Sequence, residues 1–117
     1  MEPFVPEELK KLPPCVASFT RTRCSSGWYV RAVFCHEGFG AGAFCESALY
    51  FHDPDECWDA SKVVWEKIAP EPRGGIYRSV VPGGWILLAT AKGETRLPDH
   101  EHFETRFGSI TFVPEKL

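Results

Sequence analysis

The chain has 117 residues, of which 44% are hydrophobic and 25% are charged, and its net charge at pH 7 is −3. This length predicts a single domain, 1–117, that can form a core without disulfides or metal. The negative charge argues against general nucleic-acid binding, which needs a basic surface. No apolar run approaches the length of a membrane span and the acidic start lacks a signal-peptide pattern, so we expect a protein of the host cell's cytoplasm with no membrane contact.

The first half of the chain predicts a short helix followed by three strands. Residues 1–14 carry prolines near both ends, and the acid-then-base order between them favours a short N-terminal helical arm. The runs Val16–Arg23 and Trp28–Cys35 flank a turn-rich linker and predict a hairpin. A third strand is expected over Phe44–Phe51, after a glycine-rich connection.

The strongest helix-start signal follows this third strand. Asp53 suits the N-cap, the proline after it suits the first helical position, and Glu56 completes a capping-box spacing. We therefore predict the main helix over 54–68. A strand over Val63–Ile68 is the competing interpretation, because the Val-Val-Trp sequence is β-prone.

A second hairpin is predicted around Pro82–Gly84, where glycines can adopt positive φ and let the chain reverse. It joins β-prone runs over Ile76–Val81 and Trp85–Ala89. The second run is apolar without alternation, which is typical of a strand covered on both faces, so we expect Trp85 in the core. Gly108–Val113 predicts the last strand.

These elements predict an α+β fold, in which an antiparallel sheet or partly rolled barrel carries the 54–68 helix on one side. The polar residues 92–106 lie between the last two strands and predict a loop of about fifteen residues. Loops of this length are uncommon in compact domains unless they are functional or mobile.

The predicted loop contains candidate binding residues: Arg96, Leu97, Phe103 and Arg106. Apolar anchors inside a polar rim are the usual anatomy of a protein interface. In the alternative interpretation, Leu97 and Phe103 pack beneath the loop and only hold it in place.

The same segment contains a candidate metal site formed by His100, His102 and Glu104. Alternate residues of an extended chain share one face, and imidazole with carboxylate suits zinc or non-haem iron. The spacing resembles the histidine–acid ligand run of cupin barrels, but the acid falls too early and no second histidine motif follows. We expect no cofactor, with zinc as the alternative.

The five cysteines are odd in number, and no pair has a C-x-x-C spacing. Without a secretory signal, this pattern predicts reduced thiols that pack as small apolar side chains.

Two segments resemble a pairing found in small uncharacterised bacterial and phage proteins. Val81–Ile86 contains a Pro-Gly-Gly-Trp hairpin, and Ile110–Pro114 reads Ile-Thr-Phe-Val-Pro. The resemblance implies a β-rich accessory protein and supplies no catalytic residues.

No coherent catalytic set emerges from the sequence, which favours a small non-catalytic intracellular module that binds another protein. One version is a phage or mobile-element protein that inhibits a host defence component. A metal-binding protein or metal-dependent enzyme and a small-molecule sequestering protein with an aromatic pocket are the alternatives. The oligomeric state stays open.

Overall fold

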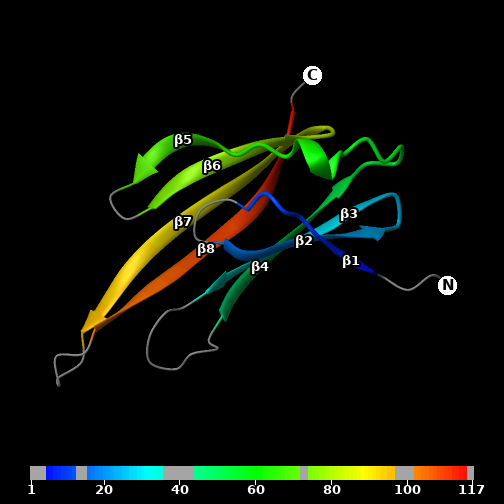
Figure 1. Ribbon diagram of the computed structural model, residues 1–117. Helices are drawn as coiled ribbons and strands as arrows, with labels where there is room; N and C mark the ends of the chain where they lie inside the picture. The colour runs from blue at the N-terminus through cyan, green and yellow to red at the C-terminus, as the bar shows by residue number, and fades with distance from the viewer. Residues whose placement is uncertain (1–4, 13–15, 36–43, 72–73, 97–101, 116–117) are drawn as a thin grey trace.

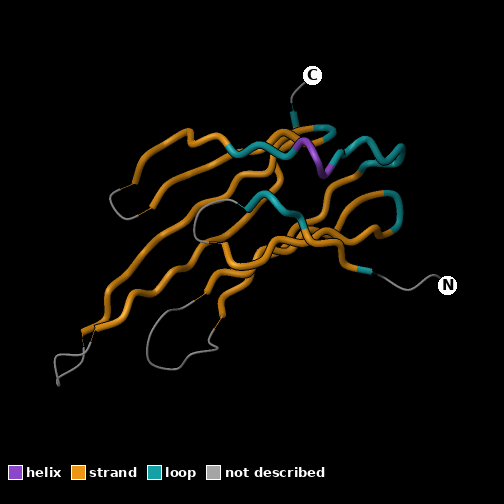
Figure 2. The backbone as a smooth tube through the Cα atoms, viewed as in Figure 1, coloured by secondary structure: helices purple, strands orange, loops and turns teal. Residues whose placement is uncertain are grey.

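The computed structural model describes residues 5–12, 16–35, 44–71, 74–96 and 102–115, which form two four-stranded antiparallel sheets (Figures 1 and 2). In the first sheet the order is β1 (Pro6–Glu8), β2 (Val16–Cys24), β3 (Gly27–Cys35) and β4 (Phe44–His52). In the second it is β5 (Glu66–Glu71), β6 (Gly74–Val81), β7 (Gly84–Arg96) and β8 (His102–Pro114). Within these ranges the only helical element is η1, a 3₁₀ turn at Ala60–Lys62.

The predicted hairpins are confirmed. β2 pairs with β3, and β6 with β7, each antiparallel and between neighbours in the sequence. The predicted third strand is β4, which pairs with β3. Gly83 adopts φ +83° in the turn between β6 and β7, a conformation that glycine reaches without a Cβ clash.

The predicted α+β class is wrong, because the main helix over 54–68 does not form. Asp53 accepts hydrogen bonds from the backbone N–H groups of Cys57 and Trp58, further along the chain than an N-cap would reach. Glu56 adopts φ +51°, which interrupts a right-handed helix. Residues 53–65 instead cross from β4 to β5, and the competing strand interpretation is closer, since β5 begins at Glu66.

Two further segments differ from expectation. The prediction of an N-terminal helical arm is wrong. This segment forms strand β1, which pairs with β2 and places Glu7 opposite Arg21. The long loop over 92–106 is also wrong. β7 and β8 remain paired as far as Arg96 and His102, and the far end of this hairpin extends away from the other strands (Figure 1).

The core lies between the two sheets. Residues that pair directly on adjacent strands point to the same face of a sheet, so each sheet buries one face there. From the first sheet it receives Phe19, Val30, Phe34 and Phe51, and from the second Ile86, Leu88 and Ile110. Burial of each such side chain contributes about 1.5–3 kcal/mol.

A glycine permits close approach between the sheets. A Cβ atom at Gly108 would lie 2.7 Å from Cε1 of Phe34 and 2.4 Å from the carbonyl oxygen of Ala89. Beside it, the hydroxyl of Ser47 on β4 accepts a hydrogen bond from the Ile110 N–H of β8 at 3.0 Å. Edge strands β4 and β8 therefore meet at one seam of the two sheets.

Trp85 is not in the core, contrary to expectation. Ile86 and Leu88 are fully buried, whereas Trp85 and Leu87 are half-buried on the outer face of the second sheet. The guanidinium of Arg78 stacks on Trp85, with its Cζ atom 4.4 Å from the ring centroid. The apolar run of β7 therefore contributes alternate residues to the core and to an apolar outer face. It does not indicate a second layer that covers the sheet.

Candidate functional site

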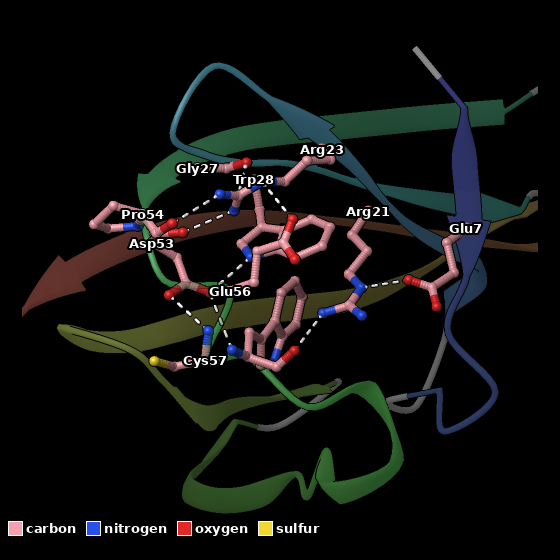
Figure 3. A network of polar contacts seen from close by, with 10 residues as sticks. Glu7, Arg21, Arg23, Gly27, Trp28, Asp53, Pro54, Glu56 and Cys57 are labelled. Carbon is pink, nitrogen blue, oxygen red and sulfur yellow. Dashed lines mark hydrogen bonds and ion pairs between the residues drawn. The ribbon is translucent and has the colours of Figure 1, made fainter. Parts of the chain in front are cut away.

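A network of polar contacts joins the first sheet to residues 53–58, which follow β4 (Figure 3). Arg21 is buried, and its Cζ atom lies 4.0 Å from the centroid of the Trp28 ring and 5.0 Å from that of Trp58. Its Nε donates to Glu7 at 2.5 Å, and its Nη1 donates to the Trp58 carbonyl at 2.6 Å. The guanidinium thus joins β1, β2 and the crossover between the sheets.

Asp53 is the second buried charge of this network, with 2% of its surface exposed. Its carboxylate accepts hydrogen bonds from Trp28 Nε1 at 2.8 Å, Cys57 N at 2.9 Å and Trp58 N at 3.0 Å. Burial raises the pKa of the Asp53 carboxyl, but these hydrogen bonds and the nearby charge of Arg23 together lower the pKa below 3.8.

The network holds the crossover against the first sheet. Arg23 donates to the Asp53 carbonyl at 2.7 Å and forms an ion pair with Glu56 at 3.1 Å. Arg21 and Asp53 have their charges neutralised or hydrogen-bonded, so neither is free to act as a general acid, base or nucleophile. We assign the network a structural role.

The predicted binding residues fall on the far part of the β7–β8 hairpin. Arg96 pairs with His102, Phe103 with Thr95, and Arg106 with Lys92. The pairing of β7 with β8 has no register shift. The positions of Phe103 and Trp85 therefore fall on the same side of the two-stranded ladder. Leu97 lies outside the described residues.

The predicted metal ligands are only partly placed. His102 and Glu104 are alternate residues of β8, and Glu104 pairs with Glu94 across the hairpin. His100 lies outside the described residues. Within the part of the chain that the structure describes, no group of three histidine, cysteine or acidic residues is arranged to hold a metal ion. The zinc site stays a prediction.

The thiols at Cys24, Cys45 and Cys57 are free. Cys45 is half-buried and packs against the core as the sequence predicted, whereas Cys57 is exposed and does not.

The outer face of the second sheet carries a row of apolar side chains beside a charged pair. Val80, Trp85 and Val113 are direct neighbours on β6, β7 and β8, and the two valines are 62% and 38% exposed. The next row across the sheet contains Glu66, Arg78 and Leu87, and Arg78 binds the Glu66 carboxylate at 3.1 Å. We call these six residues the Trp85 face.

The sheet edges are less suited to binding. The edge strand β5 carries Glu66, Lys67 and Pro70, and β1 has only three residues and begins with Pro6. Charges, prolines and short length all hinder pairing with a further strand. Because β4 and β8 lie against each other, the faces rather than the edges are open to a partner.

Comparison of the chain with protein-family models, with curated proteins and with solved structures finds no match. No helix in the described ranges is long and apolar enough to span a membrane.

The sequence analysis missed the Trp85 face, although it contained a signal. Val80 and Trp85 are equally far from the two-residue turn Pro82–Gly83, so the hairpin register places them opposite each other. Both runs contain apolar residues at the positions of this face. This pattern is as consistent with an apolar outer surface on the hairpin as with a second layer of structure packed over it.

Proposed function

We propose that the protein is a small non-catalytic module that binds another folded protein through the Trp85 face. The observation that supports this proposal is the apolar row of Val80, Trp85 and Val113, in which both valines are exposed and the Trp85 ring is half-buried under Arg78. Solvent-exposed apolar patches that span several strands mark interaction sites in soluble proteins. Tryptophan and arginine are also the residues most enriched among those that dominate binding energy.

The chemistry of the face favours one kind of partner. Arg78 is already neutralised by Glu66 and is spread over the Trp85 ring, so the face carries little net charge at its centre. A highly charged partner surface would lose solvation without gaining an ion pair. The partner therefore presents a flat, mainly apolar and uncharged protein surface.

Of the predicted binding residues, Phe103 can extend this interface. Phe103 and Arg106 belong to the same hairpin as Trp85, and Phe103 shares the alternation of Trp85 along it. A partner that covers the Trp85 face could continue along β7 and β8 to this end. Inhibition of a host defence protein stays the finer version of the proposal and is an analogy with small accessory proteins.

The proposal is tested with two matched valine variants. Val80→Glu places a charge on the Trp85 face, whereas Val64→Glu places the same charge at an equally exposed valine of the crossover. The partner is captured from the native cell, identified, purified and titrated against each variant. We expect Val80→Glu to weaken binding about tenfold or more and Val64→Glu to leave it unchanged.

Equal affinities of the two variants would contradict the proposal, provided that both melt within a few degrees of the wild type. Sedimentation of the protein alone tests a second copy as the occupant. A dimer that Val80→Glu dissociates and Val64→Glu leaves intact would replace the separate partner and overturn that part of the proposal.

A further inference from the structure

Three buried side-chain polar atoms have no hydrogen-bond partner among the residues that the structure describes. They are the indole nitrogens of Trp58 and Trp65 and the hydroxyl oxygen of Ser79. Ser79 and Trp58 are only 2% and 6% exposed. A buried polar group without a partner lowers stability, and native proteins satisfy nearly all such groups.

The register of the second sheet places Trp65 beside Ser79. Glu66 pairs with Arg78 on the outer face. One residue beyond this pair, Trp65 and Ser79 are therefore neighbours on the inner face. Trp65 packs against the core there, with its ring edge-on to Phe19 of β2. The Trp65 indole and the Ser79 hydroxyl thus come from adjacent positions.

Trp58 approaches Ser79 along β6. Val81 is two residues from Ser79 on the same strand and shares its inner face. Val81 and Trp58 line one hollow of about 300 Å³, between the crossover and the turn after β6. The Trp58 ring reaches inward to Phe51, with 5.3 Å between the ring centroids. Ser79 therefore has one indole across the strands and the other along its own strand.

The three groups favour a small neutral ligand that both accepts and donates hydrogen bonds. An indole nitrogen only donates, so the two indoles cannot satisfy each other, and neither donates to Ser79 directly. A water molecule can accept from both indole N–H groups and donate to the hydroxyl oxygen. An anion could also accept from all three, but burial of its charge is costly, and the guanidinium near Trp58, that of Arg21, is already paired with Glu7.

We propose that one ordered water molecule is bound between the sheets and is shared by the Ser79 hydroxyl and the indole N–H groups of Trp58 and Trp65. Buried waters typically make about three hydrogen bonds to groups that are otherwise unsatisfied, which matches this set. The site lies in the interior and does not depend on the proposed function.

The bound water gives the crossover a polar contact with the second sheet. The hydrogen bonds that the crossover makes with Arg21, Arg23 and Trp28 all tie it to the first sheet. Through the water, Trp58 of the crossover is joined to Ser79 of β6.

The first test detects the water in the isotopically labelled protein. Rotating-frame Overhauser spectra report water protons close to an indole N–H, and the sign of the signal separates this contact from proton exchange. We expect contacts at Trp58 and Trp65. Trp28 is the internal control and should show none, because its indole N–H donates to Asp53 at 2.8 Å.

The second test removes the hydroxyl. Ser79→Ala should raise the unfolding equilibrium constant about tenfold and weaken the water contacts at both indoles, because the water loses one of its three partners. Ser109→Ala, at an exposed serine of the same sheet, should match the wild type. If the hydroxyl were dry, its burial would itself be a cost, and Ser79→Ala would be the more stable protein.

Three results would overturn the proposal. One is the absence of a water contact at either indole. Another is a Ser79→Ala variant that unfolds no more readily than the wild type. The third is a saturable shift of both indole resonances when sodium chloride is added, which would assign the site to an anion. If Ser79→Ala does not fold, the spectrum of the wild type decides the result.

Discussion

Arg21 and Asp53 show how this small domain accommodates two buried charges. Each is satisfied by several partners at once: Arg21 by Glu7, a carbonyl and two indole rings, and Asp53 by three N–H donors. Loss of one partner from such a group leaves an uncompensated buried charge or dipole, which is costly.

We expect Asp53→Ala to lower the free energy of unfolding by about 2–4 kcal/mol, because it leaves the Trp28 indole N–H and two backbone N–H groups without an acceptor. Urea unfolding followed by tryptophan fluorescence measures the change. A loss below about 0.5 kcal/mol would show that water or another group replaces the carboxylate.

The same carboxylate predicts a pH dependence. Because the Asp53 pKa is lowered in the folded state, its contribution to stability is complete above its unfolded-state pKa near 3.8 and is lost as the pH falls through the folded-state pKa. Asp53→Asn should therefore be less stable than the wild type at pH 7, and the difference should shrink as the pH falls below 3.8.

Asp59 provides the control for this experiment. Hydrogen bonds from the Ser61 hydroxyl and the Ser61 N–H lower its pKa as well, but its side chain is exposed. Asp59→Asn should change the dependence of stability on pH in the same direction but by less than Asp53→Asn, because solvent screens the exposed carboxylate. Identical acid profiles for the two Asn variants would refute the assignment to Asp53.

Trp85 lies on the outer face and Phe34 lies in the core, so truncating each side chain tests this assignment. Phe34 is fully buried between the sheets, so Phe34→Ala should cost about 3–5 kcal/mol. Trp85 is half-buried under Arg78, and Trp85→Ala should cost about 1 kcal/mol. Chemical denaturation of both variants compares the two. A larger loss for Trp85→Ala would return this ring to the core.

At the scale of the elements, the strands that pair with their sequence neighbours could be predicted. Residues 28–34 alternate in burial, Val16–Cys24 and Gly27–Cys35 flank a tight turn, and both signals are local. The crossover over 53–65 could not be predicted from the sequence. Its conformation is set by contacts with Arg21 and Trp28, which are distant along the chain. The helix-start residues Asp53 and Glu56 are present there, but they bind Trp28 and Arg23 of the first sheet instead of starting a helix.

The far part of β7 and β8 was missed for a different reason. Strands that extend beyond the sandwich need no alternation of apolar and polar residues, since no core lies beneath them. Residues 92–106 therefore read as a loop, although their backbones pair in a continuous ladder.

Gly108 is the position where β8 depends on a missing side chain. The Cβ atom in Gly108→Ala would displace the Phe34 ring or the Ala89 carbonyl, and we expect a loss of about 1–3 kcal/mol. Ser109→Ala, at the exposed neighbouring residue, should be nearly neutral. Thermal unfolding compares the two variants, and a neutral Gly108→Ala would mean that the sheets can separate there without cost.

At the scale of the whole molecule, two sheets packed by their inner faces leave two outer faces in solvent. The outer face of the second sheet is apolar around Trp85, and that of the first carries paired tyrosines and threonines. From the sequence alone the aromatic residues could not be divided between core and surface, because that division depends on which sheet face each strand buries. The candidate site in the sequence was therefore placed in a supposed loop.

Amide hydrogen exchange of the protein alone and in its purified complex tests the central claim most directly. If the Trp85 face binds the partner, the complex should show new protection at Arg78–Val80, Trp85–Leu87 and Thr111–Val113, the segments of β6, β7 and β8 that contribute to this face. Protection confined to the first sheet or to the crossover, with these segments exchanging as in the free protein, would contradict it.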